Sequence, residues 1–356
     1  MEIEILRTIE EIEEIKEDWE TIEKMNNNNI YVQYGFIKNW VENVFDKNDV
    51  LFIIVVKEKD SILGIAPLYI QIRKILSFRI KELKFIGNGD YKNFILKEDF
   101  SNKYSIIKKI LDVIFENDNL FDRIVLEKIE SKSNLAYYFL KDDRYNKNFN
   151  FYNETPFLNL KKIRNGELKL SKPSKVNKFK NKLKRDLGYK FEVEENINKE
   201  LFNEIINLHL EEQEYLKEEM NRRNRRSIFF QEGLNNFYKS TVVNNSKMIL
   251  FILKTDNDEI INYKLCYKEN KIIYSWNSAY NIKYESFSPN SVIYKEIFDY
   301  LLDFSDIEIF DFGAGRYPWK FKWTKDFNIV YNFESWNEKN WKIKMIKKLI
   351  NIKNKF

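Results

Sequence analysis

The sequence predicts an α/β protein in which one structural unit occurs twice. Helix and strand patterns alternate along the 356 residues, and a strand–turn–strand segment at 51–72 is followed by a second one at 248–267. After each of them a further strand, a helix and a final strand come in the same order. A repeated order of this kind is typical of a duplicated domain, and it sets the boundary between the two copies near 150–165.

The first copy begins with a short strand at 3–6 and two amphipathic helices. Apolar residues recur every three or four positions from Ile9 to Ile22 and again over 36–45, which predicts one buried face on each helix. The strand that starts at Leu51 is almost continuously apolar and is therefore expected to be buried on both faces. The other expected elements are strands at 77–86 and 93–96, a helix at 104–115 and a strand at 123–127.

The second copy repeats the order of strand, helix and strand after its hairpin. We expect a strand at 271–279, a helix at 291–302 and a strand at 307–312. The helix follows Ser288-Pro289, which are typical residues for a helix start. A helix that begins just after a strand offers its amide groups and the positive end of its dipole to an anion, although an ordinary capped helix has the same sequence signature.

The composition excludes several classes of site. The chain has one cysteine, Cys266, and one histidine, His209, so an internal disulfide and a zinc site of Cys/His sets are excluded. No signal peptide and no apolar run of membrane-spanning length is evident, so we expect a cytoplasmic protein. The phosphate-binding glycine motifs of nucleotide-binding folds are absent, and we expect no metal.

Charge is concentrated locally, although the net charge is only +5. Residues 171–190 carry eight bases and one acid, and Arg222 to Arg226 form a second basic segment. A local basic surface suggests a bound anion rather than a nucleic-acid coat. The segment 171–190 also contains a helical stripe, which fits either a phosphate-bearing ligand or a solvated face: Lys175, Lys178, Lys182 and Arg185.

The last twenty residues carry seven bases and one acid, and they predict a basic amphipathic helix. Its apolar residues, which share one face, are Trp341, Met345, Leu349, Ile352 and Phe356. Such a helix could lie on an anionic membrane surface, whereas docking on the protein's own domain is the more common use of this pattern.

His209 is the one imidazole available for catalysis. On a helix, Glu212 and Gln213 follow it by three and four positions, which could orient the ring as a base, or could be ordinary neighbours of a surface histidine. Cys266 lies in an apolar strand and is interpreted as a core residue.

Several blocks of the sequence are informative through their content and their order. The most informative block is 274–323, with YSWNSAYN, FSPNSVIYKEIFDY and IEIFDFGAGRYPWKFKW. The others are the helix around Trp19, the segment around Trp40, and the residues 64–70, 85–95, 154–160, 175–187 and 208–209. Together these blocks resemble the CelD/BcsL-type acetyltransferase family, whose members are tandem domains of the acyl-CoA N-acyltransferase (GNAT) superfamily, similar in architecture to the FemAB peptidyltransferases.

The resemblance implies two tandem GNAT-like domains at 1–155 and 156–336, each a mixed, mostly antiparallel sheet flanked by helices, followed by the basic helix at 337–356. It also implies that acetyl-CoA or another acyl-CoA binds the second domain, between two splayed strands. The implied donor-binding residues are Trp276, Asn277, Ser278, Ser288, Asn290 and Ser291. The family commonly has glycine where this chain has Asn290, so a side chain stands where backbone approaches phosphate.

The expected reaction is direct acyl transfer in a ternary complex, in which a backbone N–H near 276–278 polarises the thioester carbonyl. Asp311 is the first candidate for the general base, with Glu212 or His209 second, although Asp311 could instead cap the turn before Gly313. Lys320 would stabilise developing negative charge. Candidate groove and acceptor residues are Tyr317 and Trp323 in the second domain, and Asp90 and Tyr91 in the first. The first domain has no capped helix at the equivalent place, so we expect it to bind no donor.

The sequence therefore predicts an acyltransferase, acetyl transfer being favoured, that acts on an amine or hydroxyl of a sugar, polysaccharide or small metabolite. One alternative is a FemAB-like transferase that uses aminoacyl-tRNA, the one nucleic acid considered as a partner. Another is a catalytically inactive binding protein, which the altered residue at Asn290 would permit.

Overall fold

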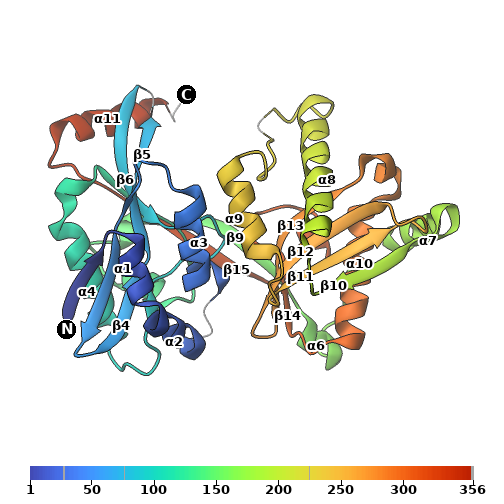
Figure 1. The fold of residues 1–356 in the computed structure, drawn as a ribbon, viewed down its shortest axis with the longest axis horizontal. Helices are drawn as coiled ribbons and strands as arrows, with labels where there is room; N and C mark the ends of the chain where they lie inside the picture. Colours follow the sequence, from blue (N-terminus) through green and yellow to red (C-terminus); the bar gives the residue numbers. More distant parts are fainter. Residues whose placement is uncertain (27–28, 76, 224, 354–356) are drawn as a thin grey trace. The chain divides into compact units, whose positions relative to one another are not determined.

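The computed structural model describes residues 1–26, 29–75, 77–223 and 225–353, without the side chains of Asn26 and of 351–353. The chain forms two compact units (Figure 1). Unit 1 comprises residues 1–153 and 329–356, and unit 2 comprises 154–328. The chain crosses from one unit to the other within strand β9 (Phe149–Asn159) and returns within β15 (Phe327–Trp336).

Unit 1 has its strands in two sheets, with orders β1-β3-β4-β7 and β15-β8-β6-β5-β2. Its pairs are antiparallel except β6 with β8. The helices are α1 (Ile9–Glu14), α2 (Lys16–Asn26), α3 (Tyr34–Val44), α4 (Lys103–Glu116), α5 (Asn134–Lys141) and α11 (Trp341–Lys353). The strands are β1 (Glu2–Leu6), β2 (Val50–Leu51), β3 (Ile53–Glu58), β4 (Ser61–Ala66), β5 (Leu68–Ile75), β6 (Phe78–Phe85), β7 (Ile95–Leu96), β8 (Arg123–Glu130) and β15.

Two expected elements of unit 1 are divided. The helix expected over 9–22 becomes α1 and α2, which meet at Ile15, and Trp19 of α2 is fully buried. The second strand of the hairpin is broken at Pro67, which has no N–H to donate. Beyond this proline the chain joins the other sheet as β5, so β4 and β5 each pair with different strands.

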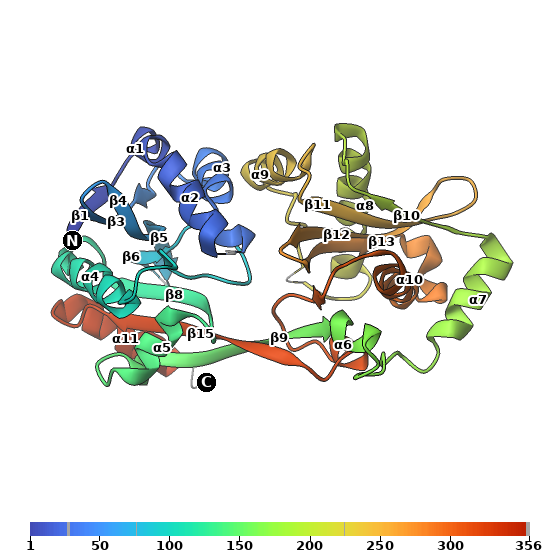
Figure 2. The same ribbon diagram turned by 90° about the horizontal axis from the view of Figure 1, so that it is seen from below.

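Unit 2 is built on one sheet with the order β10-β11-β12-β13-β14-β9, in which β13 and β14 are parallel. Helices α8 and α9 cover one face and α10 covers the other (Figure 2). The strands are β10 (Lys190–Glu194), β11 (Met248–Lys254), β12 (Ile260–Glu269), β13 (Ile272–Tyr280) and β14 (Ile309–Asp311). The helices are α6 (Leu160–Arg164), α7 (Val176–Leu187), α8 (Lys199–Glu218), α9 (Glu232–Val242) and α10 (Pro289–Phe304). The α/β fold class is confirmed. Unit 2 has the expected order of hairpin, strand, helix and strand, whereas in unit 1 the strands β5, β6 and β7 stand between the β3–β4 hairpin and α4.

The end of the chain belongs to unit 1. Residues 329–336, expected in the second domain, pair with β8 as part of β15, and Phe333 stacks on Phe139 of α5 with ring centroids 4.5 Å apart. Helix α11, expected as a separate segment, packs on the same unit through Ile343 and Ile346. This division arises because β15 supplies the strand next to β8, which sequence periodicity did not reveal. Within the described residues no helix has the length and apolarity needed to cross a membrane.

Phe333 tests whether the returning strand completes the core of unit 1. The Phe333→Ala variant should lose about 3–5 kcal/mol of unfolding free energy, because it leaves a cavity among Phe139, Tyr145 and Leu126. Urea denaturation measures the change. Phe304→Ala removes a side chain that is 76% exposed and should change stability by less than about 0.5 kcal/mol. Equal effects of the two variants would contradict this packing.

Candidate active site

The strands β13 and β14 of unit 2 pair over three residues and then diverge. Ile272–Tyr274 pair with Ile309–Asp311, whereas β13 continues to Tyr280. Over the same residues β14 also pairs with β9, and this contact continues beyond Asp311: the Phe312 N–H donates to Pro156 O (3.0 Å) and the Gly315 N–H donates to Glu154 O (2.9 Å). The pairing of β13 with β14 ends at Tyr274, and residues 274–278 of β13 are all half-buried.

An ion pair holds the diverging segment in place. The guanidinium of Arg316 binds the Glu154 carboxylate through Nε, at 2.9 and 3.0 Å, and through a terminal nitrogen, at 2.5 Å. Because two nitrogens of the guanidinium take part, the pair sets the orientation of Arg316 as well as its distance from Glu154. The turn after β14 is therefore attached to β9 by a side-chain ion pair as well as by backbone hydrogen bonds.

The middle of β13 contains a bulge at Trp276. Leu265 of β12 pairs with Asn277 and Cys266 pairs with Ser275, which leaves Trp276 as the extra residue. The Trp276 N–H donates to the Cys266 thiol, whose pKa burial raises to about 12. Cys266 is thus a core residue, as predicted, and the Trp276 amide proton is already engaged. Asn277 accepts a hydrogen bond from the Tyr263 hydroxyl through Oδ1.

Helix α10 follows β13 in the chain after a short turn at Ile282–Phe287, and its first turn contacts β12 through Asn290. Ser288 has a left-handed backbone (φ 50°), and its carbonyl accepts from the N–H groups of Ser291 (2.9 Å) and Val292 (3.3 Å). Its side chain makes no capping bond to any described residue. In unit 1, by contrast, α4 is capped by Asn102, which accepts from the Ser105 N–H (3.1 Å). The expectation that unit 1 lacks a capped helix is wrong, because its helix start is occupied by its own side chain.

Asn290, in the first turn of α10, bonds to a buried lysine. Its Oδ1 accepts from Lys264 Nζ at 2.9 Å and from Asn262 Nδ2 at 3.0 Å. Lys264 is 3% exposed and burial lowers its pKa to about 8. The Oδ1 of the fully buried Asn262 has no partner among the described atoms. These contacts turn the Asn290 side chain toward β12 instead of across the helix start.

Glu212 of α8 reaches the far end of β13. Its carboxylate accepts from the Tyr280 N–H (3.3 Å) and from Gln213 Nε2 (3.0 Å). Burial raises the pKa of Glu212, while the charge of Lys264 opposes that shift. A buried carboxyl with a raised pKa is a better proton acceptor than an ordinary one.

His209 bonds to a hydroxyl rather than to the carboxylate that its spacing suggested. Its Nδ1 lies 2.8 Å from Ser227 Oγ, and its ring contacts Phe229 edge-on. Burial, together with the nearby charge of Arg225, lowers the pKa of His209 to about 4. The imidazole is therefore neutral and weakly basic at pH 7.

The turn after β14 brings Asp311, Tyr317 and Lys320 together. Asp311 Oδ1 accepts from the Gly313 N–H (2.7 Å), which is the capping contact considered from the sequence. The buried Lys320 donates to Gly313 O (2.7 Å) and Ala314 O (3.0 Å) and lies 5.3 Å from the Tyr317 ring centroid. Tyr317 is half exposed, whereas Trp323 packs in the core against Phe298.

The basic helix α7 lies next to the loop before α10. Lys182 Nζ is 4.6 Å from the Phe287 ring centroid, one residue before Ser288. Lys180 pairs with Glu296 of α10 at 2.6 Å, whereas Lys175, Lys178 and Arg185 are exposed. The helix thus adds positive charge near the start of α10. In the second basic segment, Asn224 lies outside the described residues.

Asp90 and Tyr91 lie in unit 1 after β6. Asp90 accepts from Lys128 Nζ (3.3 Å), and the Tyr91 ring is buried beside Tyr31. The next residue, Lys92, pairs with Ile129 of β8, and its buried Nζ donates to Ile86 O at 2.8 Å. In unit 1 the chain itself therefore occupies the space beside β8 after β6 ends.

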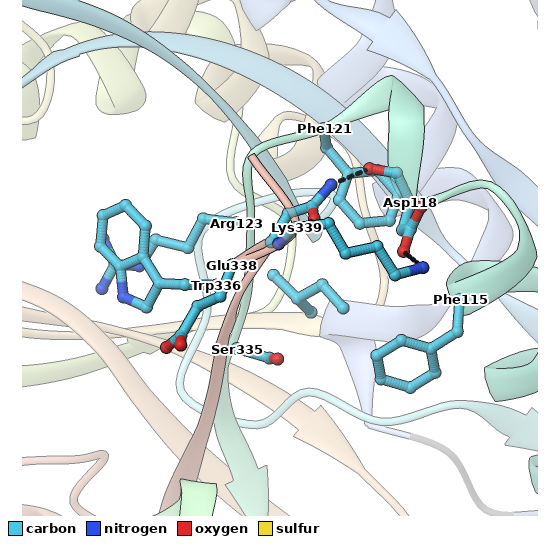
Figure 3. A pocket seen from close by; sticks show the side chains of 10 residues that line it. Phe115, Asp118, Phe121, Arg123, Ser335, Trp336, Glu338 and Lys339 are labelled. Carbon is cyan, nitrogen blue, oxygen red and sulfur yellow. Dashed lines mark hydrogen bonds and ion pairs between the residues drawn. The ribbon is translucent and has the colours of Figure 1, made fainter. Parts of the chain in front are cut away.

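A cavity of about 410 Å³ lies in unit 1, between the end of α4 and the end of β15. Figure 3 shows its apolar wall of Phe115 and Phe121 and its charged groups. Two of those groups bind each other, since Asp118 pairs with Lys339 at 2.6 Å, whereas Arg123 pairs with Glu82 and Glu334, which do not line the cavity. The pair of Asp118 with Lys339 links the segment 336–340 to the end of α4.

Comparison with known proteins agrees with this geometry. The sequence model of the acetyltransferase (GNAT) domain matches residues 171–321, so unit 2 carries an acyltransferase domain of the GNAT type. No curated protein matches the sequence. Among solved structures, FemX is similar in fold (TM-score 0.57, 14% identity, covering 94% of this chain and 97% of FemX). The structure of L-PGS from Bacillus licheniformis is similar too (TM-score 0.55, 14% identity, 93% and 94% covered).

The single histidine allows a direct test of the site's burial. In the folded protein, NMR titration of the His209 ring should give a pKa of about 4. The unfolded ring titrates near pH 6.5, so below that pH the unfolded state binds the extra proton and stability falls between about pH 6.5 and 4. His209→Asn should remove this part of the pH dependence. A titration midpoint near 6.5 would contradict the burial.

Proposed function

We propose that the chain is a CelD/BcsL-type enzyme that transfers an acyl group, acetyl in the first instance, from acyl-CoA to an amine or hydroxyl of a sugar, polysaccharide or small metabolite. A cytosolic location is part of this proposal. The observation that carries it is the edge of β13 beyond Tyr274, where the pairing with β14 has ended, in a strand that is followed in the chain by the start of α10.

The residues around that edge suit a long, phosphate-bearing thioester. The free edge of a strand offers backbone groups to an extended chain such as pantetheine. The start of α10 offers a pyrophosphate the positive end of the helix dipole and the N–H of Asn290, with Ser288 and Ser291 beside it. Pro289 has no N–H, and those of Ser291 and Val292 bond to Ser288 O. Lys182 and the exposed lysines of α7 add positive charge close by. Of the proposed oxyanion donors, we favour the backbone at Asn277 and Ser278, because the Trp276 N–H is engaged by Cys266.

We assign the general base to Asp311, with Glu212 as the alternative carboxylate. Asp311 lies where β13 and β14 separate, so it is at the narrow end of the opening, where a thioester would reach the acceptor. Lys320 brings a positive charge to the same turn. We place Tyr317 at the acceptor groove, because it is the exposed aromatic ring of that turn, and we keep Asp90 and Tyr91 as candidate acceptor contacts of unit 1. His209 is the weakest candidate base, because its pKa is about 4.

The second candidate function is transfer from aminoacyl-tRNA in the manner of the FemAB enzymes. It is supported by the exposed bases of α7 beside the loop before α10, which would suit RNA phosphates as well as those of CoA. The two donors are distinguished by binding: CoA would stabilise the protein in the first case, and charged tRNA with a steep salt dependence would bind in the second. If the folded protein binds neither CoA nor charged tRNA, the remaining hypothesis is a catalytically inactive binding protein.

The donor test uses thermal shift with acetyl-CoA, free CoA and a long-chain acyl-CoA. A ligand at 100 times its dissociation constant should stabilise the folded protein by about 2.7 kcal/mol. Stabilisation by all three would indicate that the nucleotide part is recognised. The proposal fails if none of these ligands raises the melting temperature.

Asn290 offers a variant in which stability and binding change in opposite directions. Asn290→Asp puts a carboxylate at the start of α10 and beside Lys264, which favours the helix, but it repels an anionic donor. We expect an unchanged or higher melting temperature and acetyl-CoA affinity about tenfold weaker by calorimetry, about 1.4 kcal/mol. Asn134→Asp, at the start of α5 in unit 1, is the matched control and should leave affinity unchanged. Equal affinity in both variants would place the donor elsewhere.

The base is tested by two isosteric variants. Asp311→Asn keeps an oxygen that can accept the Gly313 N–H, so the turn should survive while kcat falls by about 100-fold or more. Glu212→Gln should retain most of kcat. The assay follows CoA release from acetyl-CoA with a panel of amino and hydroxyl sugars. If Glu212→Gln loses the activity and Asp311→Asn keeps it, Glu212 is the base.

A further inference from the structure

Helix α11 has two apolar faces, of which unit 1 covers one. Ile343 and Ile346 are each 4% exposed and form a small apolar cluster with Ile80. The partly buried residues packed against this cluster are Ile75, Phe78, Trp336 and Ile350. The sequence pattern had identified the other face, which includes Trp341, as the apolar one. Phe356 and the side chain of Ile352, which belong to that pattern, lie outside the described residues. The helix does dock on its own unit, but through the face that was not expected.

The opposite face is apolar and open to solvent. Trp341, Met345 and Leu349 are 68%, 45% and 41% exposed. They are spaced four residues apart, so they form one stripe that turns slowly around the helix. Trp341 lies opposite Ile343, and the stripe moves closer to the side of Ile346 toward Leu349. Single exposed apolar residues are common on protein surfaces, but three in a row along one helix are not explained by packing within unit 1.

Positive charge borders this stripe on both sides. By the helical period, Lys344 and Lys348 lie along one border and Lys342 along the other, and all three are exposed. Residues 341–353 contain five lysines and no acid. The β5–β6 hairpin, on which α11 packs, adds exposed Lys74 and Arg79.

The stripe is held firmly rather than carried on a loose tail. Just before α11, the Arg123 guanidinium lies 4.6 Å from the Trp336 ring centroid, and the Asn337 side chain donates to Asp118 O at 2.8 Å. The ion pair between Lys339 and Asp118, drawn in Figure 3, adds a third attachment. A further hollow of about 440 Å³ opens between the hairpin and the helix, lined by Phe78, Arg79, Trp341 and Met345 among others.

We propose that this face of unit 1 docks on the surface of an anionic lipid bilayer. We call it the lipid face, and it consists of Trp341, Met345, Leu349, Lys342, Lys344, Lys348 and Arg79. An apolar stripe that contains tryptophan and has lysines on both borders fits the boundary between acyl chains and negative headgroups, because the apolar groups enter the boundary while the ammonium groups stay at headgroup level. A second copy of the chain is a poor occupant, since a two-fold contact would set lysines against lysines. The proposal does not depend on the acyl transfer assigned to unit 2.

The test is co-sedimentation of the full chain with lipid vesicles. Vesicles of equimolar phosphatidylcholine and phosphatidylglycerol should bind the protein, and phosphatidylcholine alone should bind it far less. Lys342→Gln, Lys344→Gln and Lys348→Gln together should weaken partitioning into the anionic vesicles by about 100-fold, as three interfacial charges are lost. Trp341→Ala with Leu349→Ala should weaken it as well. Added salt should lower binding of the unaltered chain.

Matched controls separate this face from general charge and hydrophobicity. Lys190→Gln, Lys199→Gln and Lys271→Gln together remove three exposed charges from unit 2, and Phe304→Ala removes a ring that is 76% exposed. Both should bind the anionic vesicles like the unaltered chain. All variants should keep the melting temperature and the response to acetyl-CoA, so a failure here is distinct from a failure of the proposed enzyme.

Three results would overturn the proposal. The first is equal binding to neutral and anionic vesicles, or no binding to either. The second is a dimer in light scattering that Trp341→Ala dissociates, which would make the face an interface between copies. The third is binding to polyglutamate without binding to vesicles, which would indicate an acidic protein partner.

Discussion

The candidate site of unit 2 depends on where the pairing of β13 with β14 stops. Over 309–311, β14 bonds to β13 along one edge and to β9 along the other. Beyond Asp311 the bonds to β9 continue, whereas the pairing with β13 has ended, and β13 runs on to Tyr280. The bidentate pair of Arg316 with Glu154 adds a side-chain contact to β9, and residues 274–278 of β13 are half-buried.

Buried cations give the surroundings of the candidate site their polarity. Lys264 and Lys320 are both almost fully buried, and each bonds to neutral oxygen, Asn290 Oδ1 in one case and the carbonyls of Gly313 and Ala314 in the other. Burying an ammonium group is costly unless such acceptors surround it. The lowered pKa of Lys264 and the raised pKa of Glu212 follow from the same burial, so the two groups shift in opposite directions and toward neutrality.

Local sequence signals predicted several parts of the site, and contacts between distant segments decided the others. The start of α10 could be predicted from Pro289 at its first position, although Ser288 makes no side-chain cap, and the end of β14 could be predicted from its apolar run. The partner of His209 could not, since Ser227 lies in a loop eighteen positions away. Lys264 was missed, although a lysine inside the buried strand β12 was a readable signal. The role of Asn290 needed the position of Lys264, which no spacing reveals.

By itself the sequence determined the alternation of helices and strands, the repeated unit, and the core character of Cys266, because periodicity and burial are local properties. Tertiary structure decided which strands pair and which helix faces are covered. It placed β15 beside β8 in unit 1 and divided one expected strand at Pro67 into β4 and β5. It also determined that α11 packs on unit 1 through Ile343 instead of Trp341. These outcomes depend on which apolar surfaces meet, and two apolar stripes on one short helix look equally fit for burial until the neighbouring surface is known.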